Sequence, residues 1–147
     1  MQTATNDGVM LGYGNLNDDD IRFSQKQFDR YRHLLPAMRY ALDCGAGIGR
    51  VTKQLLSKYF ENCHIVEPAK NFMAKAKASL KNLRTEKGAR VQVKFFHHGL
   101  QDFEFKQTYD LIWTNWTLCH LTDEDLMGFL RNAHTYLSPK GSLAKPD

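Results

Sequence analysis

The chain has 147 residues, of which 42% are hydrophobic, and this length suits one domain with its own apolar core. Its formal net charge of +4 comes from scattered side chains. The densest basic stretch, residues 74–84, has the pattern of a solvated helix face, so nucleic-acid binding is not expected and is kept only as an alternative. No apolar run could span a bilayer, and residues 1–8 lack the apolar core of a secretion signal, so we expect no membrane association.

The three cysteines, Cys44, Cys63 and Cys119, are odd in number, widely spaced and set in apolar segments. This pattern is typical of buried thiols in a reducing compartment, and not of a disulfide framework or a zinc site. We therefore expect a cytoplasmic or nuclear protein without a metal centre. His97 and His98 do not alter this, because adjacent residues of a strand point to opposite faces.

Residues 1–38 are expected to form a lid loop and a helix. The stretch MLGYG at residues 10–14 indicates a hairpin-like loop, and the acidic residues 18–20 suit the N-terminus of a helix. Ser24 is a candidate cap for a helix that runs to Leu35. One face of that helix would be apolar, formed by Phe28, Tyr31, Leu34 and Leu35.

From residue 39 to residue 147, strand and helix patterns alternate. The predicted strands lie at residues 40–44, 63–68, 91–98 and 109–118, and the predicted helices at 49–60, 71–83 and 122–137. Thr122 and Asp125 form a capping box for the last helix. Its inner face would hold Leu126, Phe129, Leu130, Ala133 and Leu137. This alternation predicts an α/β fold with a parallel, doubly wound sheet that binds its ligand at the carboxyl ends of the strands.

A glycine-rich loop, ALDCGAGIGRVTK, leaves the first predicted strand and opens a helix. Gly45, Gly47 and Gly49 follow the order G-x-G-x-G, whereas the dinucleotide fingerprint requires a glycine where this chain has Arg50. Such a loop lets a ligand approach the backbone and meet free N–H groups. The spacing therefore argues against a pyrophosphate ligand.

Three charged residues around this loop indicate which ligand it binds. Arg50 could meet a carboxylate, Asp43 at the strand end could meet an amine, and Glu67 ends the next strand, where an acid grips ribose hydroxyls. Together they describe S-adenosylmethionine. The alternative is that the glycines form only a tight turn and that Glu67 is a solvated strand end.

Three motifs then resemble one family, the α-N-terminal protein methyltransferases, which methylate proteins that begin Xaa-Pro-Lys. They are LDCGAGIGR, GLQDF and YDLIWTNWTLCHLTD, and the resemblance runs from about residue 8 to residue 141. It implies a Rossmann-like S-adenosylmethionine-dependent methyltransferase fold at residues 39–147 and a protein substrate with a free N-terminus. The implied cofactor site comprises Asp43, Gly45, Gly47, Gly49, Arg50, Glu67, Pro68, Ala69, Leu100, Gln101 and Asn115.

Two positions of this implied cofactor site differ from the family pattern. Glu67 stands where the family has aspartate, and Asn115 stands where it has a glutamine that is one methylene longer. Leu100 and Gln101 match the pair that meets the adenine.

The resemblance also implies a peptide site. Trp116 matches the tryptophan against which the substrate proline packs, and His120 matches the histidine that helps to deprotonate the amine. The lid is matched by Leu11, Gly12 and Tyr13, with one glycine fewer than in the family.

A histidine suits this chemistry, because an α-amine with a pKa of about 7.7–8.0 is partly protonated near neutral pH and a neutral imidazole can accept that proton. The alternative for His120 is a core histidine with a backbone partner. Trp113 and Trp116 would face opposite ways along a strand, so one of them is expected in the core.

The family's sheet continues beyond the fourth strand, whereas residues 142–147 form at most a stub of a fifth strand. The acidic residues that would follow and bind the substrate lysine are absent from this sequence. We therefore expect a truncated sheet with an open fourth-strand edge, which a partner chain could cover. Two alternatives to an N-terminal protein methyltransferase remain. One is a catalytically impaired module that binds the cofactor or a protein, and the other is a methyltransferase that acts on a small molecule.

Overall fold

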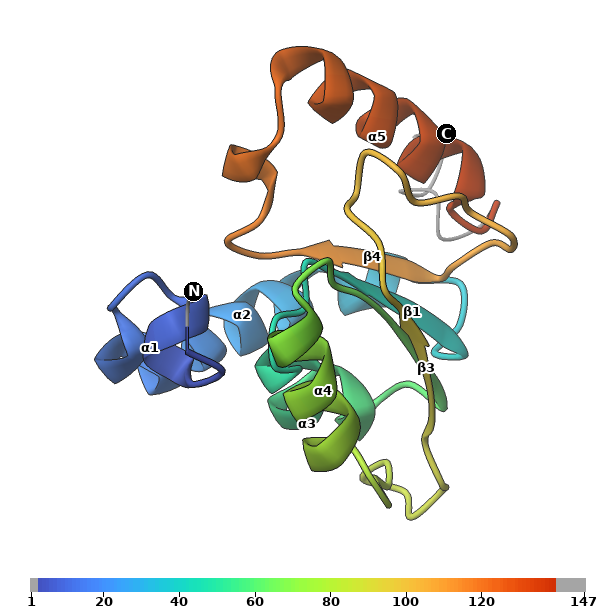
Figure 1. Ribbon diagram of the computed structural model, residues 1–147. Helices are drawn as coiled ribbons and strands as arrows, with labels where there is room; N and C mark the ends of the chain where they lie inside the picture. The colour runs from blue at the N-terminus through green and yellow to red at the C-terminus, as the bar shows by residue number, and fades with distance from the viewer. Residues whose placement is uncertain (1–2, 140–147) are drawn as a thin grey trace.

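A four-stranded parallel sheet organises the protein, which the computed structural model describes from residue 3 to residue 139 (Figure 1). Its strand order is β3-β2-β1-β4, and the strands are β1 (Tyr40–Cys44), β2 (Asn62–Val66), β3 (Gln92–Phe96) and β4 (Leu111–Thr114). The α-helices are α1 (Asn6–Val9), α2 (Asn17–Tyr31), α3 (Arg50–Gln54), α4 (Lys70–Ser79) and α5 (Asp123–Tyr136). The predicted α/β fold with a parallel sheet is confirmed.

The two faces of the sheet carry different apolar clusters. On one face, Ala41 and Cys63 pack with Phe28 of α2 and with residues at and after α3, and Ile65 packs with α4. On the other face, Leu42 and Val66 pack with α5. Figure 1 shows this arrangement, with α3 and α4 on one side of the sheet and α5 on the other. Both faces are covered at the centre of the sheet, which explains why β1 and β2 are buried at four of their five positions, whereas the edge strand β3 alternates exposed and partly buried residues.

The helix ends differ from those predicted. Helix α2 begins at Asn17, so Ser24 is buried in its middle and is not its cap, and Tyr31 is exposed. The acidic residues 18–20 lie in the first turn of α2, where negative charge complements the helix dipole. The long helix predicted at 49–60 ends at Gln54, because Leu55 has non-helical dihedral angles, and a short 3-10 helix, Leu56–Lys58, follows.

The lid and the end of the fourth strand also differ. Residues 10–14 are not a hairpin: they join α1 to the 3-10 helix Gly14–Leu16, with positive φ at Leu11 and Gly12. Strand β4 stops at Thr114, and the 3-10 helix Leu118–His120 follows it. Cys119 is exposed, not buried, whereas Cys44 and Cys63 are buried as expected.

Helix α5 confirms the predicted cap. The Thr122 hydroxyl oxygen accepts a hydrogen bond of 3.2 Å from the Asp125 backbone N–H. Phe129 and Ala133 are buried, but Leu130 is exposed, so the inner face is narrower than predicted.

Strand β4 lies at one edge of the described sheet and is joined to β1 by Asp110. The carboxylate oxygen Oδ2 of Asp110 accepts hydrogen bonds of 3.0 Å from the backbone N–H groups of Arg39 and Tyr40. The predicted fifth-strand stub lies outside the described residues. Between residues 3 and 139, no helix is both long enough and apolar enough to cross a lipid bilayer.

Two buried titratable groups lie on opposite faces of the sheet. Asp43 of β1 accepts a hydrogen bond of 2.7 Å from the Thr52 hydroxyl, and burial raises its pKa from 3.8 to about 6, although Thr52 and Arg50 oppose the rise. His64 of β2 lies 2.8 Å from the Tyr109 hydroxyl through Nδ1, and burial, aided by Lys94, lowers its pKa from 6.5 to about 4. The two groups therefore titrate in the same acidic range with opposite effects on stability.

These shifts predict how the free energy of unfolding varies with pH. The contribution of Asp43 is fully present below pH 3.8 and is lost as pH rises through 6, since the folded state holds the proton more tightly. The contribution of His64 runs the other way, because its folded pKa is depressed. In Asp43→Asn the acceptor for Thr52 is kept but the titration is removed. The free energy of unfolding of the wild type minus that of Asp43→Asn should therefore fall by about 2–3 kcal/mol between pH 4 and pH 7.

Urea unfolding at a series of pH values measures this difference, and the His64 contribution cancels in the subtraction. Parallel curves for the two proteins over this range would contradict the assignment of the shift to Asp43.

Candidate functional site

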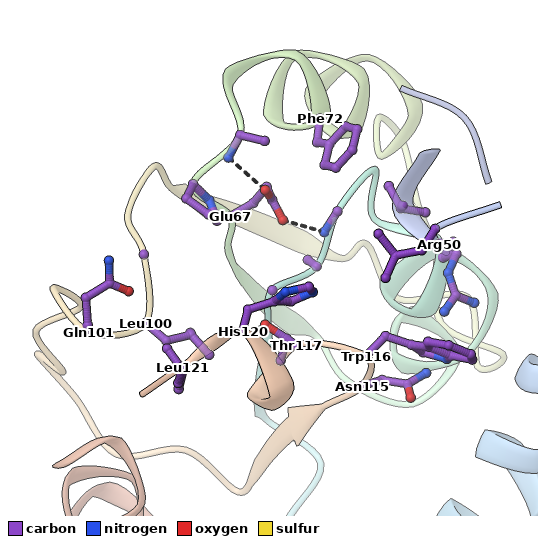
Figure 2. Close-up of a pocket in the computed structure, with 18 residues that line it drawn as sticks. Arg50, Glu67, Phe72, Leu100, Gln101, Asn115, Trp116, Thr117, His120 and Leu121 are labelled. Carbon is purple, nitrogen blue, oxygen red and sulfur yellow. Dashed lines mark hydrogen bonds between the residues drawn. The ribbon is translucent and has the colours of Figure 1, made fainter. Parts of the chain in front are cut away.

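A cavity of about 470 Å³ opens at the carboxyl ends of β1, β2 and β4 (Figure 2). This volume falls in the range of small-molecule sites. The parallel register places Cys44, Val66 and Thr114 side by side, so the loops that follow these strands surround one space. The predicted site residues that line it are Leu11, Gly45, Gly47, Arg50, Glu67, Pro68, Ala69, Leu100, Gln101, Asn115, Trp116 and His120.

Four predicted residues lie outside the cavity lining: Gly12, Tyr13, Gly49 and Asp43. Gly12 and Tyr13 are exposed in the lid. A Cβ on Gly49 would contact Leu80, the residue directly after α4. Asp43 is buried and bonded to Thr52 behind the loop. Its recognition of a ligand amine therefore stays a prediction.

The glycine loop can approach its neighbours closely because it lacks side chains. A Cβ on Gly45 would lie 2.1 Å from the Thr117 hydroxyl oxygen, and one on Gly47 would lie 2.9 Å from a Val9 methyl carbon. Both glycines also have positive φ, at 65° and 58°, which other residues rarely adopt. The loop is thus pressed between the N-terminal segment and the loop that follows β4.

Glu67 connects the glycine loop to helix α4. The carboxylate is 5% exposed, and its two oxygens accept hydrogen bonds from the backbone N–H groups of Gly47 at 2.8 Å and Ala69 at 2.7 Å (Figure 2). Burial raises the pKa of Glu67, while these two bonds and the charges of His97 and His120 lower it. Each oxygen keeps a further lone pair that can accept a hydroxyl group.

Arg50, the first residue of α3, is held by the N-terminal helix. Its Nη1 atom lies 2.7 Å from Oδ2 of Asp20 and 3.3 Å from Oδ1 of Asn17, both in α2. The guanidinium carries five N–H donors, so others remain for a ligand carboxylate.

The segment after β4 supplies the opposite wall. Trp116 has a positive φ of 59° and is 44% exposed, while Trp113 packs in the core beneath α2, as expected for one of the two. His120 is exposed at the end of its 3-10 helix, which contradicts the alternative of a core histidine. Figure 2 shows its ring in the cavity between Glu67 and Trp116.

Sequence reasoning missed several lining residues. Phe72 and Leu121 extend the apolar lining around Leu100, and Thr117 and Val9 pack against the glycines. Phe72 lies in the first turn of α4, the helix that follows Glu67. The contact partner Asp20 lies 96 positions from Trp116, and no local pattern links the two.

These residues fit S-adenosylmethionine. Glu67 offers acceptors for ribose hydroxyls, Arg50 offers donors for a carboxylate, and an apolar wall suits an adenine ring. Among residues 3–139, no group of three or more His, Cys, Asp or Glu side chains could hold a metal ion.

Comparison with known proteins agrees with this geometry. A family model described as AdoMet dependent proline di-methyltransferase matches residues 2–145. The N-terminal Xaa-Pro-Lys N-methyltransferase 1 of Bos taurus is 43% identical over 148 residues, which cover 98% of this chain and 64% of that protein. The Homo sapiens protein of the same name is 40% identical over 147 residues, with 97% and 64% covered. The chain thus spans 64% of the length of these relatives.

Solved structures show the same fold. A structure from Leishmania major, described as a SAM-dependent methyltransferase, matches with a TM-score of 0.81 and 34% identity, covering 96% of this chain and 54% of that one. An amino pentose methyltransferase from Micromonospora echinaspora, solved with SAM bound, shares the fold with a TM-score of 0.65 at 20% identity, covering 82% and 46%. The sequence and structural matches agree that the chain belongs to the family of AdoMet dependent proline di-methyltransferases.

Proposed function

We propose that this chain binds S-adenosylmethionine in the 470 Å³ cavity and methylates the α-amino group of proteins that begin Xaa-Pro-Lys. The observation that carries the proposal is that Arg50, Glu67, Trp116 and His120 line one space, although they come from three separate parts of the chain. The substrate class follows the names of the relatives, of which this chain spans 64%.

The cofactor would be held by groups of known geometry. Glu67 would accept the ribose hydroxyls, Arg50 would donate to the carboxylate, and Leu100 and Phe72 would contact the adenine. The bound cofactor supplies a methyl group on a positively charged sulfur.

The chain's own contribution to transfer is to prepare the amine. His120 would accept the proton from the substrate ammonium group, which leaves a lone pair free for attack. Trp116 would pack against the substrate proline and hold the amine near His120. The exposed position of His120 in the cavity allows it to exchange that proton with water.

Cofactor binding can be tested at the glycine loop. Gly45→Ala should weaken binding of S-adenosylhomocysteine more than 10-fold in calorimetry, because the new methyl would overlap Thr117. Gly88→Ala is the matched control: Gly88 also has a positive φ, but nothing lies within 4 Å of its Cβ position. Equal affinity in Gly45→Ala and Gly88→Ala would refute the assignment of the loop.

Methyl transfer is tested by mass spectrometry of a Ser-Pro-Lys peptide incubated with the chain and S-adenosylmethionine. We expect the mass to increase by one to three methyl groups, and no increase when the peptide is N-acetylated. His120→Ala should lower the rate by about 100-fold or more, the usual contribution of a general base. Undiminished methylation in His120→Ala would remove this residue as the base.

The alternative function is a module that binds the cofactor or a protein without catalysis. Cofactor binding in calorimetry, combined with no mass gain in the peptide, would support this alternative over the enzyme. The cytoplasmic or nuclear location stays a prediction.

We further propose that the partner chain that covers the β4 edge is a second copy of this protein. A groove of about 390 Å³ runs between α2 and β4, with Phe23 and Tyr31 exposed beside it. Within residues 3–139, the buried indole nitrogen of Trp113, which lines this groove, has no hydrogen-bond partner. Sedimentation velocity should show association of the wild type, and Phe23→Asp should abolish it. The control Met127→Asp, which changes an exposed residue of α5 away from this groove, should leave the association unchanged. A monomer at all concentrations would contradict self-association.

A further inference from the structure

The carboxylate of Asp20 joins two walls of the cavity. It lies in the first turn of α2, and its side chain is 12% exposed. One oxygen, Oδ1, accepts a hydrogen bond of 2.9 Å from the Trp116 indole N–H. The other, Oδ2, lies 2.7 Å from Nη1 of Arg50 and 3.1 Å from the Asn115 amide nitrogen. Thus one side chain contacts a residue at the start of α3 and two residues after β4.

The energetics of this contact differ from those of an ordinary surface ion pair. Arg50 is only 7% exposed, so its charge is largely removed from water and depends on a neighbouring anion. Asn17 also contacts Arg50, through a longer and uncharged contact of 3.3 Å, and the buried carboxyl group of Asp43 interacts with Arg50 electrostatically. Removing a partner of such a pair leaves an uncompensated charge, which is more damaging than the loss of an exposed pair.

Trp116 also depends on this contact. It follows the end of β4, where the sheet no longer fixes the backbone, and it adopts a positive φ. Its half-exposed indole ring could take several orientations, and the hydrogen bond to Asp20 selects one of them.

We propose that Asp20 is a positioning residue that fixes Arg50 and Trp116 relative to each other, and so links the cofactor end of the cavity to its acceptor end. The proposal rests on the proposed function, which assigns Arg50 to the cofactor and Trp116 to the peptide. Because Asp20 belongs to α2, this helix becomes part of the site through its contacts with Arg50 and Trp116. Preorganised groups bind tighter because less conformational entropy is lost on binding.

The first experiment measures cofactor affinity in the full chain. Asp20→Ala should weaken binding of S-adenosylhomocysteine about 10-fold or more in calorimetry, because Arg50 loses its anion. Asp20→Asn should also weaken binding, since its single amide oxygen cannot accept from both Trp116 and Arg50, and the negative charge beside Arg50 is lost. Asp19→Ala is the matched control: it removes the same charge from the same turn, but the ion pair of Asp19 is with exposed Arg22. Its affinity should stay within 2-fold of wild type.

The second experiment needs neither ligand nor activity. In a Trp113→Phe background, Trp116 is the remaining tryptophan, and acrylamide quenching of its fluorescence reports its freedom and exposure. Quenching should increase in Asp20→Ala and should not change in Asp19→Ala. Trp116→Phe removes the indole N–H while keeping an aromatic ring. The affinity effects of Asp20→Ala and Trp116→Phe should therefore be non-additive.

Several outcomes would overturn the proposal. Unchanged cofactor affinity and unchanged quenching in Asp20→Ala would show that the carboxylate positions neither wall, and additive effects would show that the two walls are independent. Circular dichroism identifies loss of folding in Asp20→Ala, in which case the nearly isosteric Asp20→Asn decides. If neither the wild type nor any variant methylates the peptide, the proposed function is wrong. The cofactor affinity and the fluorescence quenching would then still decide whether Asp20 positions Arg50 and Trp116.

Discussion

The hydrogen bonds of the Glu67 carboxylate are the interaction on which the site depends. Glu67 directly follows β2. Its carboxylate accepts hydrogen bonds from two backbone N–H groups, one in the glycine loop and one just before α4. Both are donors that the local structure would otherwise leave unpaired in a buried place. The glycine loop therefore keeps its conformation at the carboxyl end of the sheet, where it lines the cavity. Burial raises the pKa of Glu67, and the two bonds work against this rise.

A second set of contacts closes the cavity from the N-terminal side. Helix α2 reaches the floor through Asp20 and Asn17, and Val9 lies directly over Gly47. The glycine loop is thus packed from below by the sheet and from the side by a segment that precedes the sheet in sequence. This packing makes the N-terminal residues part of the site.

The parts predicted correctly from sequence depend on neighbours in the chain. Strand β1 is a mostly apolar, buried run because helices cover both faces of the sheet, and the cap of α5 needs only Thr122 and Asp125. The errors arose where distant contacts override local preference. Ser24 is a good capping residue, yet it is buried in mid-helix because α2 extends back to Asn17. Helix α3 stops early at Leu55, whose side chain is fully buried in the core.

The sequence by itself determined the order of strands and helices, the glycine loop and the residue types at the strand ends, since each is a short-range pattern of apolar and polar positions. It also carried Arg50, Glu67, Trp116 and His120, which the structure brings to one cavity. Only the tertiary structure decided how these groups are held. Asp43 is bonded to Thr52 of α3, and Asp20 joins Arg50 to Trp116. The reason is physical: hydrogen bonds between residues far apart in the chain depend on packing, which no local sequence pattern encodes.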